Sequence, residues 1–211
     1  SDKTAIDASG LLDDEHPTGR NVAYGVREFA QGTIMNGMAL HGGLRVFGGT
    51  FLVFSDYLRG AIRLSALQKL PVVYVFTHDS IAVGEDGPTH EPVEQLMSLR
   101  SLPNVDVLRP ADPNEVIAAW QQAIDSVSRT SKLADAGVAR GGYVVSPQNG
   151  MRPSGILIAS GSEVSLAIKA QERLFKLGED VSVVSMPSME RFDAQPQNYK
   201  DQVLPPSVRR R

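Results

Sequence analysis

The sequence predicts an α/β fold: a domain with a parallel sheet flanked by helices, followed by part of a second α/β domain. Short apolar runs rich in β-branched residues alternate with segments of helical periodicity, which is typical of parallel sheets. The clearest case lies late in the chain, where strands over 155–159 and 181–185 enclose a helix that ends near Leu177. This βαβ unit is expected to be parallel and right-handed.

The first half of the chain shows the same alternation. Its most distinctive strand is the apolar run 71–76, which ends in the polar stretch 77–80 (Thr-His-Asp-Ser). A buried parallel strand that carries chemistry at its carboxyl end has this profile. The helices of this half are expected at 22–41, 56–67 and 92–99, and the strands at 46–54 (with a turn at 48–49), 71–76 and 105–108.

A capped helix is expected near the end of the first domain. Asp112 suits the N-cap, Pro113 the first turn, and Glu115 follows three residues after the cap, so a helix is expected to run to about Ser126. A brief strand is expected over 143–145. The domain boundary is placed between about 127 and 150, which assigns 1–140 to the first domain and 141–211 to a second, partial one.

The composition of the 211 residues excludes several classes of function. The net charge is −3 and the basic residues are dispersed, apart from three arginines at 209–211 that are expected to be a solvated tail, so no nucleic-acid partner is expected. No apolar run is long enough for a membrane helix. The absence of cysteine excludes disulfides and thiol catalysis and fits a reducing cytoplasm. Because the chain starts with Ser1 and not Met, we expect a native protein that begins earlier.

The densest candidate site spans 77–90, where two of the four histidines, His78 and His90, accompany several carboxylates. A merely polar loop is the alternative, but titratable groups that follow a buried strand favour a functional site. His78 and His90 with Asp79 or Asp86 could in principle bind zinc. Their spacing matches no standard metal pattern, so no metal site is expected within this chain.

Two further patterns are ambiguous by themselves. Glu28 opens a glycine-bearing apolar helix, where a carboxylate favoured by the helix dipole is the simpler interpretation. Phe51, Phe54 and Tyr57 recur every three residues, which suits core packing and equally suits stacking on a flat heterocycle. The residues alone leave both alternatives open.

In combination, these patterns resemble transketolase in order and spacing, over nearly the whole chain. The loop 77–94 is the most specific part of the resemblance. The similar stretches are 25–29 (GVREF), 48–54 (GGTFLVF), 77–81 (THDSI), 84–94 (GEDGPTHEPVE), 109–112 (RPAD) and 159–165 (ASGSEVS).

The resemblance implies a pyrimidine-binding domain of a thiamine-diphosphate enzyme joined to the start of a C-terminal domain. Members of this family transfer a two-carbon ketol unit between sugar phosphates, using thiamine diphosphate and a divalent cation, magnesium or calcium. The resemblance also implies a cytoplasmic homodimer, in which the diphosphate-binding domain of the other subunit completes each site.

For the cofactor, the resemblance implies that Glu28 hydrogen-bonds N1′ of the aminopyrimidine. This contact favours the imino tautomer, which takes the thiazolium C2 proton, and it requires a carboxyl group that carries or shares a proton in an apolar pocket. Phe51, Phe54 and Tyr57 match the aromatic pyrimidine pocket of the family. His90 matches a catalytic histidine near the thiazolium and the donor substrate.

For the substrate, the resemblance implies that Asp86 contacts a sugar hydroxyl and that His78 contacts a phosphate. His90 matches a residue that reaches the carbonyl or C1 hydroxyl of the donor. Ser1 matches a phosphate-contacting serine, although the family's Ser-Asn-x-Thr reads Ser-Asp-Lys-Thr here.

The departures from the family imply a fragment that is inactive alone. No Gly-Asp-Gly motif for the diphosphate and metal occurs in the chain, and a strand with a phosphate-binding arginine is expected to be missing between Ser126 and Gly141. Two alternatives stay open: a related enzyme such as dihydroxyacetone synthase, and a non-catalytic module that serves dimerisation. The stretch 77–81 argues against deoxyxylulose-phosphate synthase.

Overall fold

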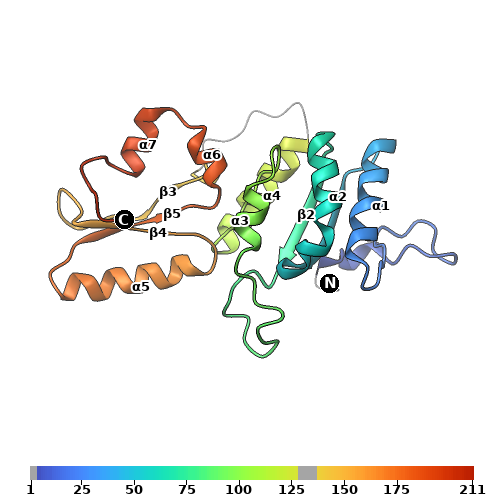
Figure 1. Cartoon of the computed structure of the whole chain (residues 1–211), viewed down its shortest axis with the longest axis horizontal. Coiled ribbons are helices and arrows are strands. Elements are labelled where there is room, and N and C mark those ends of the chain that lie inside the picture. Colours follow the sequence, from blue (N-terminus) through green and yellow to red (C-terminus); the bar gives the residue numbers. More distant parts are fainter. Residues whose placement is uncertain (1–3, 128–136) are drawn as a thin grey trace. The chain divides into compact units, whose positions relative to one another are not determined.

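The computed structural model describes residues 4–127 and 137–211 and divides the chain into two compact units, Ser1–Val105 and Asp106–Arg211 (Figure 1). Each unit contains its own sheet with helices against it, which confirms the predicted α/β class.

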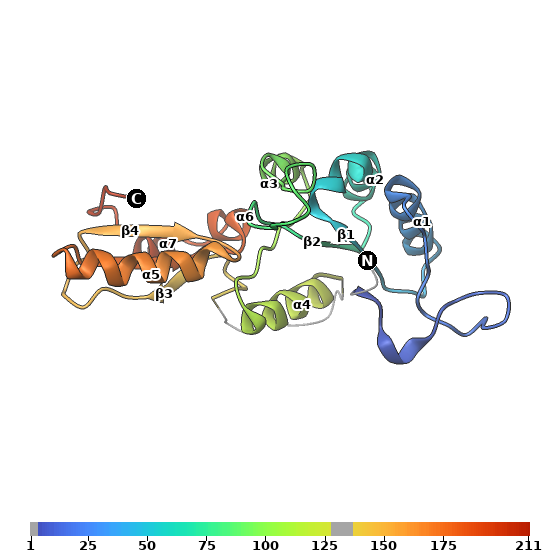
Figure 2. The same cartoon turned by 90° about the horizontal axis from the view of Figure 1, so that it is seen from below.

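The first unit is built on two parallel strands. Strand β1 pairs with β2 in continuous register, from Val46 opposite Val72 to Phe51 opposite Thr77. Helices α1 and α2 pack side by side, and α1 contacts both strands (Figures 1 and 2). The elements are η2 (Asp7–Ser9), α1 (Glu28–His41), β1 (Val46–Phe51), η3 (Leu52–Phe54), α2 (Ser55–Leu67), β2 (Val72–Thr77) and α3 (Gln95–Arg100).

Helix α1 lies close to β1 at Gly48, where a larger residue would have to displace side chains of the helix. A Cβ atom added at Gly48 would lie 2.3 Å from Met35 Sδ and 2.6 Å from Gln31 Nε2. Gln31 Nε2 also donates to the Gly49 carbonyl oxygen at 3.4 Å. Met35 lies against Gly48, and Gln31, one turn earlier in the helix, reaches the next strand residue, Gly49. Earlier helix residues therefore meet later strand residues, so α1 runs antiparallel to β1. The first turn of α1 therefore lies toward the carboxyl end of β1.

A polar network joins β2 to both helices. The Tyr74 hydroxyl lies 2.9 Å from Asn36 Oδ1 and 3.1 Å from Ser65 Oγ. Asn36 Nδ2 donates to the Ala61 carbonyl oxygen at 2.9 Å. Asn36 and Ser65 are both buried. Because buried polar groups need partners, this network fixes α1 and α2 against β2.

Three sequence expectations for the region up to 108 were wrong. Helix α1 begins at Glu28 and not near 22, because Gly25 has a left-handed φ of 63° that a helix cannot accommodate. Residues 48–49 continue β1 and form no turn. The stretch 105–108 is not a strand, since none of the described strands pairs with it.

The second unit contains a mixed sheet with the strand order β3-β5-β4. Strand β4 pairs in parallel with β5, which confirms the predicted βαβ unit, whereas β3 pairs with β5 in the antiparallel direction. The elements are α4 (Pro113–Val127), β3 (Tyr143–Ser146), β4 (Gly155–Ala159), α5 (Glu163–Lys176), β5 (Val181–Ser185), α6 (Met189–Asp193) and α7 (Gln197–Val203).

Helices cover both faces of this sheet. Helix α5 packs on β4 and β5, and α6 and α7 lie across the opposite face (Figures 1 and 2). The core on the α6–α7 side is aliphatic apart from two aromatic rings, in agreement with the low aromatic content. Its members are Ile156, Val184, Met186, Phe192, Val203 and Val208, with Tyr199 and Leu204 packed against them.

Glu115 ties the start of α4 to the sheet of this unit. Its backbone N–H donates to Asp112 Oδ1 at 2.8 Å, which confirms Asp112 as the cap. Glu115 is only 4% exposed. Its carboxylate accepts three hydrogen bonds, from the Ala111 backbone N–H at 2.8 Å, the Tyr143 hydroxyl at 2.5 Å and the Ser185 hydroxyl at 2.6 Å. Three donors therefore compensate for the burial of this charge.

Removal of the Tyr74 hydroxyl should destabilise the first unit. Tyr74→Phe leaves the buried Asn36 oxygen without its donor, which costs about 1–3 kcal/mol. The free energy of unfolding in urea measures this loss. Tyr57→Phe is the matched control, because Tyr57 is 68% exposed and a change within about 0.5 kcal/mol is expected there. Equal stability of the two variants would contradict the role of the network.

The second unit should lose stability in alkali through Tyr143. Burial, and then the adjacent Glu115 carboxylate, raise the pKa of Tyr143 above its ordinary value of 10.0. Below pH 10 the Tyr143 hydroxyl is protonated in both the folded and the unfolded chain, so its full contribution to the free energy of unfolding is present. This contribution is lost as the pH rises further, because the unfolded chain releases the proton first. Tyr143→Phe should therefore show a smaller decline in unfolding free energy above pH 10 than the unmodified chain. An identical decline would contradict this assignment.

Candidate functional site

The candidate site lies where the two parallel strands of the first unit end. Phe51 closes β1 directly opposite Thr77, the last residue of β2. The chain then continues into η3 after β1 and into the loop 78–94 after β2. The carboxyl ends of parallel strands are the usual place for ligands in α/β folds.

Five rings from these segments form an aromatic cluster, which we define as Phe51, Phe54, Tyr57, His78 and His90. The Phe51 and Phe54 rings are stacked with centroids 6.1 Å apart, and Phe54 and Tyr57 are also 6.1 Å apart. His90 stands edge-on to Phe54 at 5.3 Å and to Phe51 at 6.1 Å. The structure thus brings together the three aromatic residues and both histidines that the sequence singled out.

His78 is the most tightly placed member of the cluster. Its imidazole stacks on the Phe51 ring with centroids 3.5 Å apart and planes 19° from parallel. Its backbone adopts a left-handed φ of 53°, which is uncommon outside glycine and costs about 1–3 kcal/mol. Such a conformation persists only where surrounding contacts enforce it, and it is frequent at functional sites.

Glu28 occupies the first position of α1 and is half-buried. The antiparallel course of α1 places it toward the carboxyl end of β1, on the side of the unit where Phe51 lies. Within the described residues its carboxylate makes no hydrogen bond or ion pair with a side chain. A carboxylate at the start of a helix is favoured by the helix dipole, and this one stays available to a ligand.

The remaining substrate candidates are placed less firmly. Asp86 lies in the exposed turn 84–87, which follows β2 in the same loop as both histidines. Ser1 lies outside the described residues. The described residues contain no group of three or more His, Asp or Glu side chains that could hold a metal ion.

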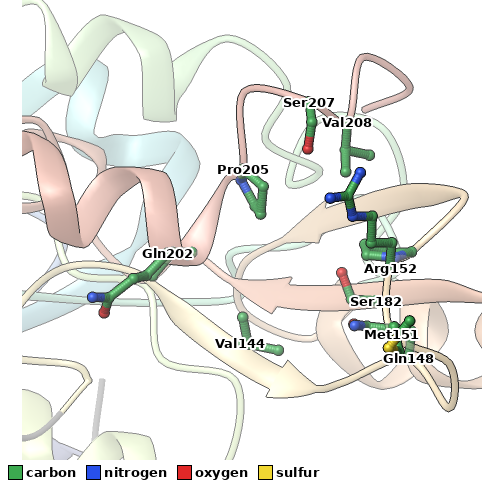
Figure 3. Close-up of a pocket in the computed structure, with 11 residues that line it drawn as sticks. Val144, Gln148, Met151, Arg152, Ser182, Gln202, Pro205, Ser207 and Val208 are labelled. Atoms are coloured by element: carbon green, nitrogen blue, oxygen red, sulfur yellow. The ribbon is translucent and has the colours of Figure 1, made fainter.

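The second unit contains a separate cavity of about 260 Å³. It is bordered by the loop 147–154, strand β5 and the segment that follows α7 (Figure 3). Arg152 and the hydroxyl of Ser182 face it, together with apolar side chains such as Val144 and Val208. No histidine or carboxylate is among its described lining residues, so it offers no general acid or base.

Two features of the site were missed by the sequence analysis. The Thr77 and Thr89 hydroxyls lie within hydrogen-bond distance of the Nδ1 atoms of His78 and His90, at 3.0 and 2.8 Å. The repeated Thr-His dipeptide was a signal for this arrangement. The stack of His78 on Phe51 had no sequence signal, because the two residues are brought together only by strand pairing.

Among the described residues, no helix has the length and apolar character needed to cross a bilayer.

Comparisons with known proteins identify the family of both parts of the chain. The family described as "Transketolase, pyrimidine binding domain" matches residues 4–133, and "Transketolase-like TK C-terminal domain" matches residues 141–211.

Curated transketolases are similar along the whole chain. That of Geobacillus stearothermophilus is 57% identical and that of Bacillus subtilis 58% identical, and each match covers 100% of this chain and 34% of the relative. The chain thus spans about a third of the length of these relatives. Each match extends over 227 positions, about 16 more than the 211 residues of the chain, so the relatives carry residues that this chain lacks.

Solved transketolases share the fold. A Pichia stipitis transketolase variant in complex with fructose 6-phosphate superposes with a TM-score of 0.88 at 42% identity, over 97% of this chain and 33% of that one. Transketolase from Leishmania mexicana gives a TM-score of 0.86 at 43% identity, over 95% and 31%. The two family matches and the high identity to curated relatives show that the chain belongs to the transketolase family, and the aromatic cluster at its strand ends agrees with this. Because it spans about a third of the length of those relatives, it is a fragment of such a protein.

Proposed function

We propose that the parent protein transfers a two-carbon ketol unit between sugar phosphates with thiamine diphosphate, and that this chain supplies the pyrimidine side of the site. The observation that carries the proposal is the aromatic cluster at the ends of β1 and β2, with Glu28 toward the same end. Family membership supports it, as does the fructose 6-phosphate complex of the Pichia stipitis relative. We further propose that residues 1–140 form the pyrimidine-binding domain and 141–211 part of the C-terminal domain.

The aromatic cluster fits a flat heterocycle. Phe54 is half-buried and Tyr57 is exposed, so both can offer ring surface to a ligand. His78 already covers one face of Phe51. A pyrimidine would therefore stack on the opposite face of Phe51 or on the rings of Phe54 and Tyr57.

When bound, thiamine diphosphate supplies the nucleophilic carbon that receives the ketol unit. Glu28 would hold a proton at N1′ of the pyrimidine, and apolar rings stacked on that pyrimidine would keep water from competing for the contact. A carboxyl group suits this role because its protonated form donates and its ionised form accepts.

The substrate side of the site would use the loop 78–94. We assign His78 to a substrate phosphate, His90 to the carbonyl or C1 hydroxyl of the donor and Asp86 to a sugar hydroxyl. Imidazole and carboxylate groups offer the donors and acceptors that phosphates and hydroxyls need. Ser1 is assigned to the phosphate by family resemblance alone.

The diphosphate and its divalent cation, magnesium or calcium, would be held by a domain outside this chain. We therefore propose that the chain alone is inactive and that the parent enzyme is a cytoplasmic homodimer whose sites are shared between subunits. Helix α1 and the residues before it support an association surface, because the apolar side chains of Val26, Phe29 and Leu40 are exposed.

The role of Glu28 can be tested in the full-length enzyme. Glu28→Gln keeps the shape of the side chain and removes the ionisable carboxyl proton, so ketol transfer should fall by about 10²- to 10⁴-fold while the fold stays intact. Steady-state kinetics and circular dichroism measure the two properties. Glu172→Gln, at an exposed position of α5, is the matched control and should keep full activity. Near-normal turnover of Glu28→Gln would contradict the proposed function.

A further inference from the structure

Both histidines of the aromatic cluster follow a threonine whose hydroxyl meets the same ring nitrogen. Thr77 Oγ1 lies 3.0 Å from His78 Nδ1, and Thr89 Oγ1 lies 2.8 Å from His90 Nδ1. The pairs lie in different backbone settings, one at the end of β2 and one in a turn. Neither threonine has a role in the proposed site so far.

Backbone geometry at His78 makes its pair possible. Successive side chains of a strand point to opposite faces, so Thr77 and His78 could not meet if β2 simply continued. The left-handed φ of 53° at His78 breaks this alternation. The stack on Phe51 then fixes the plane of the imidazole, with Nδ1 toward the Thr77 hydroxyl.

The His90 pair is held by other contacts. The backbone N–H of His90 donates to the Gly87 carbonyl oxygen at 3.0 Å. This bond closes a turn in which Gly87 has a φ of 76°. The His90 ring is then restrained edge-on by Phe54 at 5.3 Å. Two unrelated local structures therefore reach the same threonine–imidazole contact.

We propose that Thr77 and Thr89 are positioning residues: each hydroxyl donates to Nδ1 of the following histidine and keeps the imidazole proton on Nε2. A neutral imidazole has one donor and one acceptor nitrogen, so a hydrogen bond accepted at Nδ1 makes Nε2 the donor. Within the described part of the chain, neither Nε2 has a hydrogen-bond partner. Both Nε2 atoms thus stay available as donors without the need for a charged ring.

The ligand chemistry that suits two such donors is an oxygen-rich, anionic one. A phosphate oxygen or a carbonyl oxygen accepts from Nε2–H, whereas a bare Nε2 lone pair would repel it. This assignment of the ligand rests on the proposed function. The assignment of the tautomers does not, since it concerns contacts within this chain.

Long-range ¹H–¹⁵N spectra of the 211-residue chain with ¹⁵N-labelled histidine test the tautomers directly, at a pH where the rings are neutral. His78 and His90 should show the Nε2–H form, with exposed His41 as the internal reference. Thr77→Val should lower the Nε2–H to Nδ1–H ratio of His78 about 2- to 10-fold, the loss expected for one hydrogen bond, and leave His90 unchanged. Thr89→Val should do the reverse.

Conservative and control variants separate this role from a general loss of structure. Thr77→Ser and Thr89→Ser keep the hydroxyl and should retain the original ratio. Thr33→Val removes a hydroxyl that bonds only carbonyl oxygens of its own helix, and it should change neither ring. A dominant Nδ1–H form in the unmodified chain, or valine variants with unchanged ratios, would overturn the proposal. Neither outcome depends on thiamine diphosphate or on ketol transfer.

Discussion

The parallel pairing of β1 with β2 is the constraint on which the candidate site depends. It sets Phe51 opposite Thr77, so the segments that leave the two strands must start side by side. The imidazole that follows Thr77 can then reach the Phe51 ring, and η3 turns Phe54 toward the same place. A slip of one residue in this register would move every side chain to the other face and separate the rings. The polar contacts of Tyr74 and the close approach at Gly48 support this register from the helix side.

The structure also shows why this unit looks incomplete as a binding site. The aromatic cluster is only half-buried, and Tyr57 is 68% exposed, so a ligand seated on these rings would remain open to water on one side. Val26 is 92% exposed in the segment just before α1. Both features agree with our proposal that this chain, which spans about a third of the length of its relatives, contributes one side of a shared site.

Sequence patterns predicted the elements that local signals define. The strand expected at 71–76, the cap at Asp112 and the βαβ unit that ends at Ser185 were placed within a residue or two, because periodicity and capping are local. The antiparallel direction of β3 and the stack of His78 on Phe51 were missed, since both depend on how distant segments pair. The histidine loop 77–90 was singled out from its own residues, whereas Glu28 and the aromatic residues 51, 54 and 57 became candidates only through the resemblance to one family. Their exact partners, including the threonine hydroxyls, required the fold.

The central claim, that this chain is the pyrimidine half of a thiamine-diphosphate site, is tested most directly by calorimetric titration with thiamine diphosphate and magnesium. The chain would be titrated alone and after mixing with the separately produced diphosphate-binding domain of the same enzyme. We expect no measurable binding by the chain alone and clear binding by the mixture, beyond that of the added domain by itself. Tight binding by the chain alone would contradict the claim, as would a mixture that binds no better than the added domain.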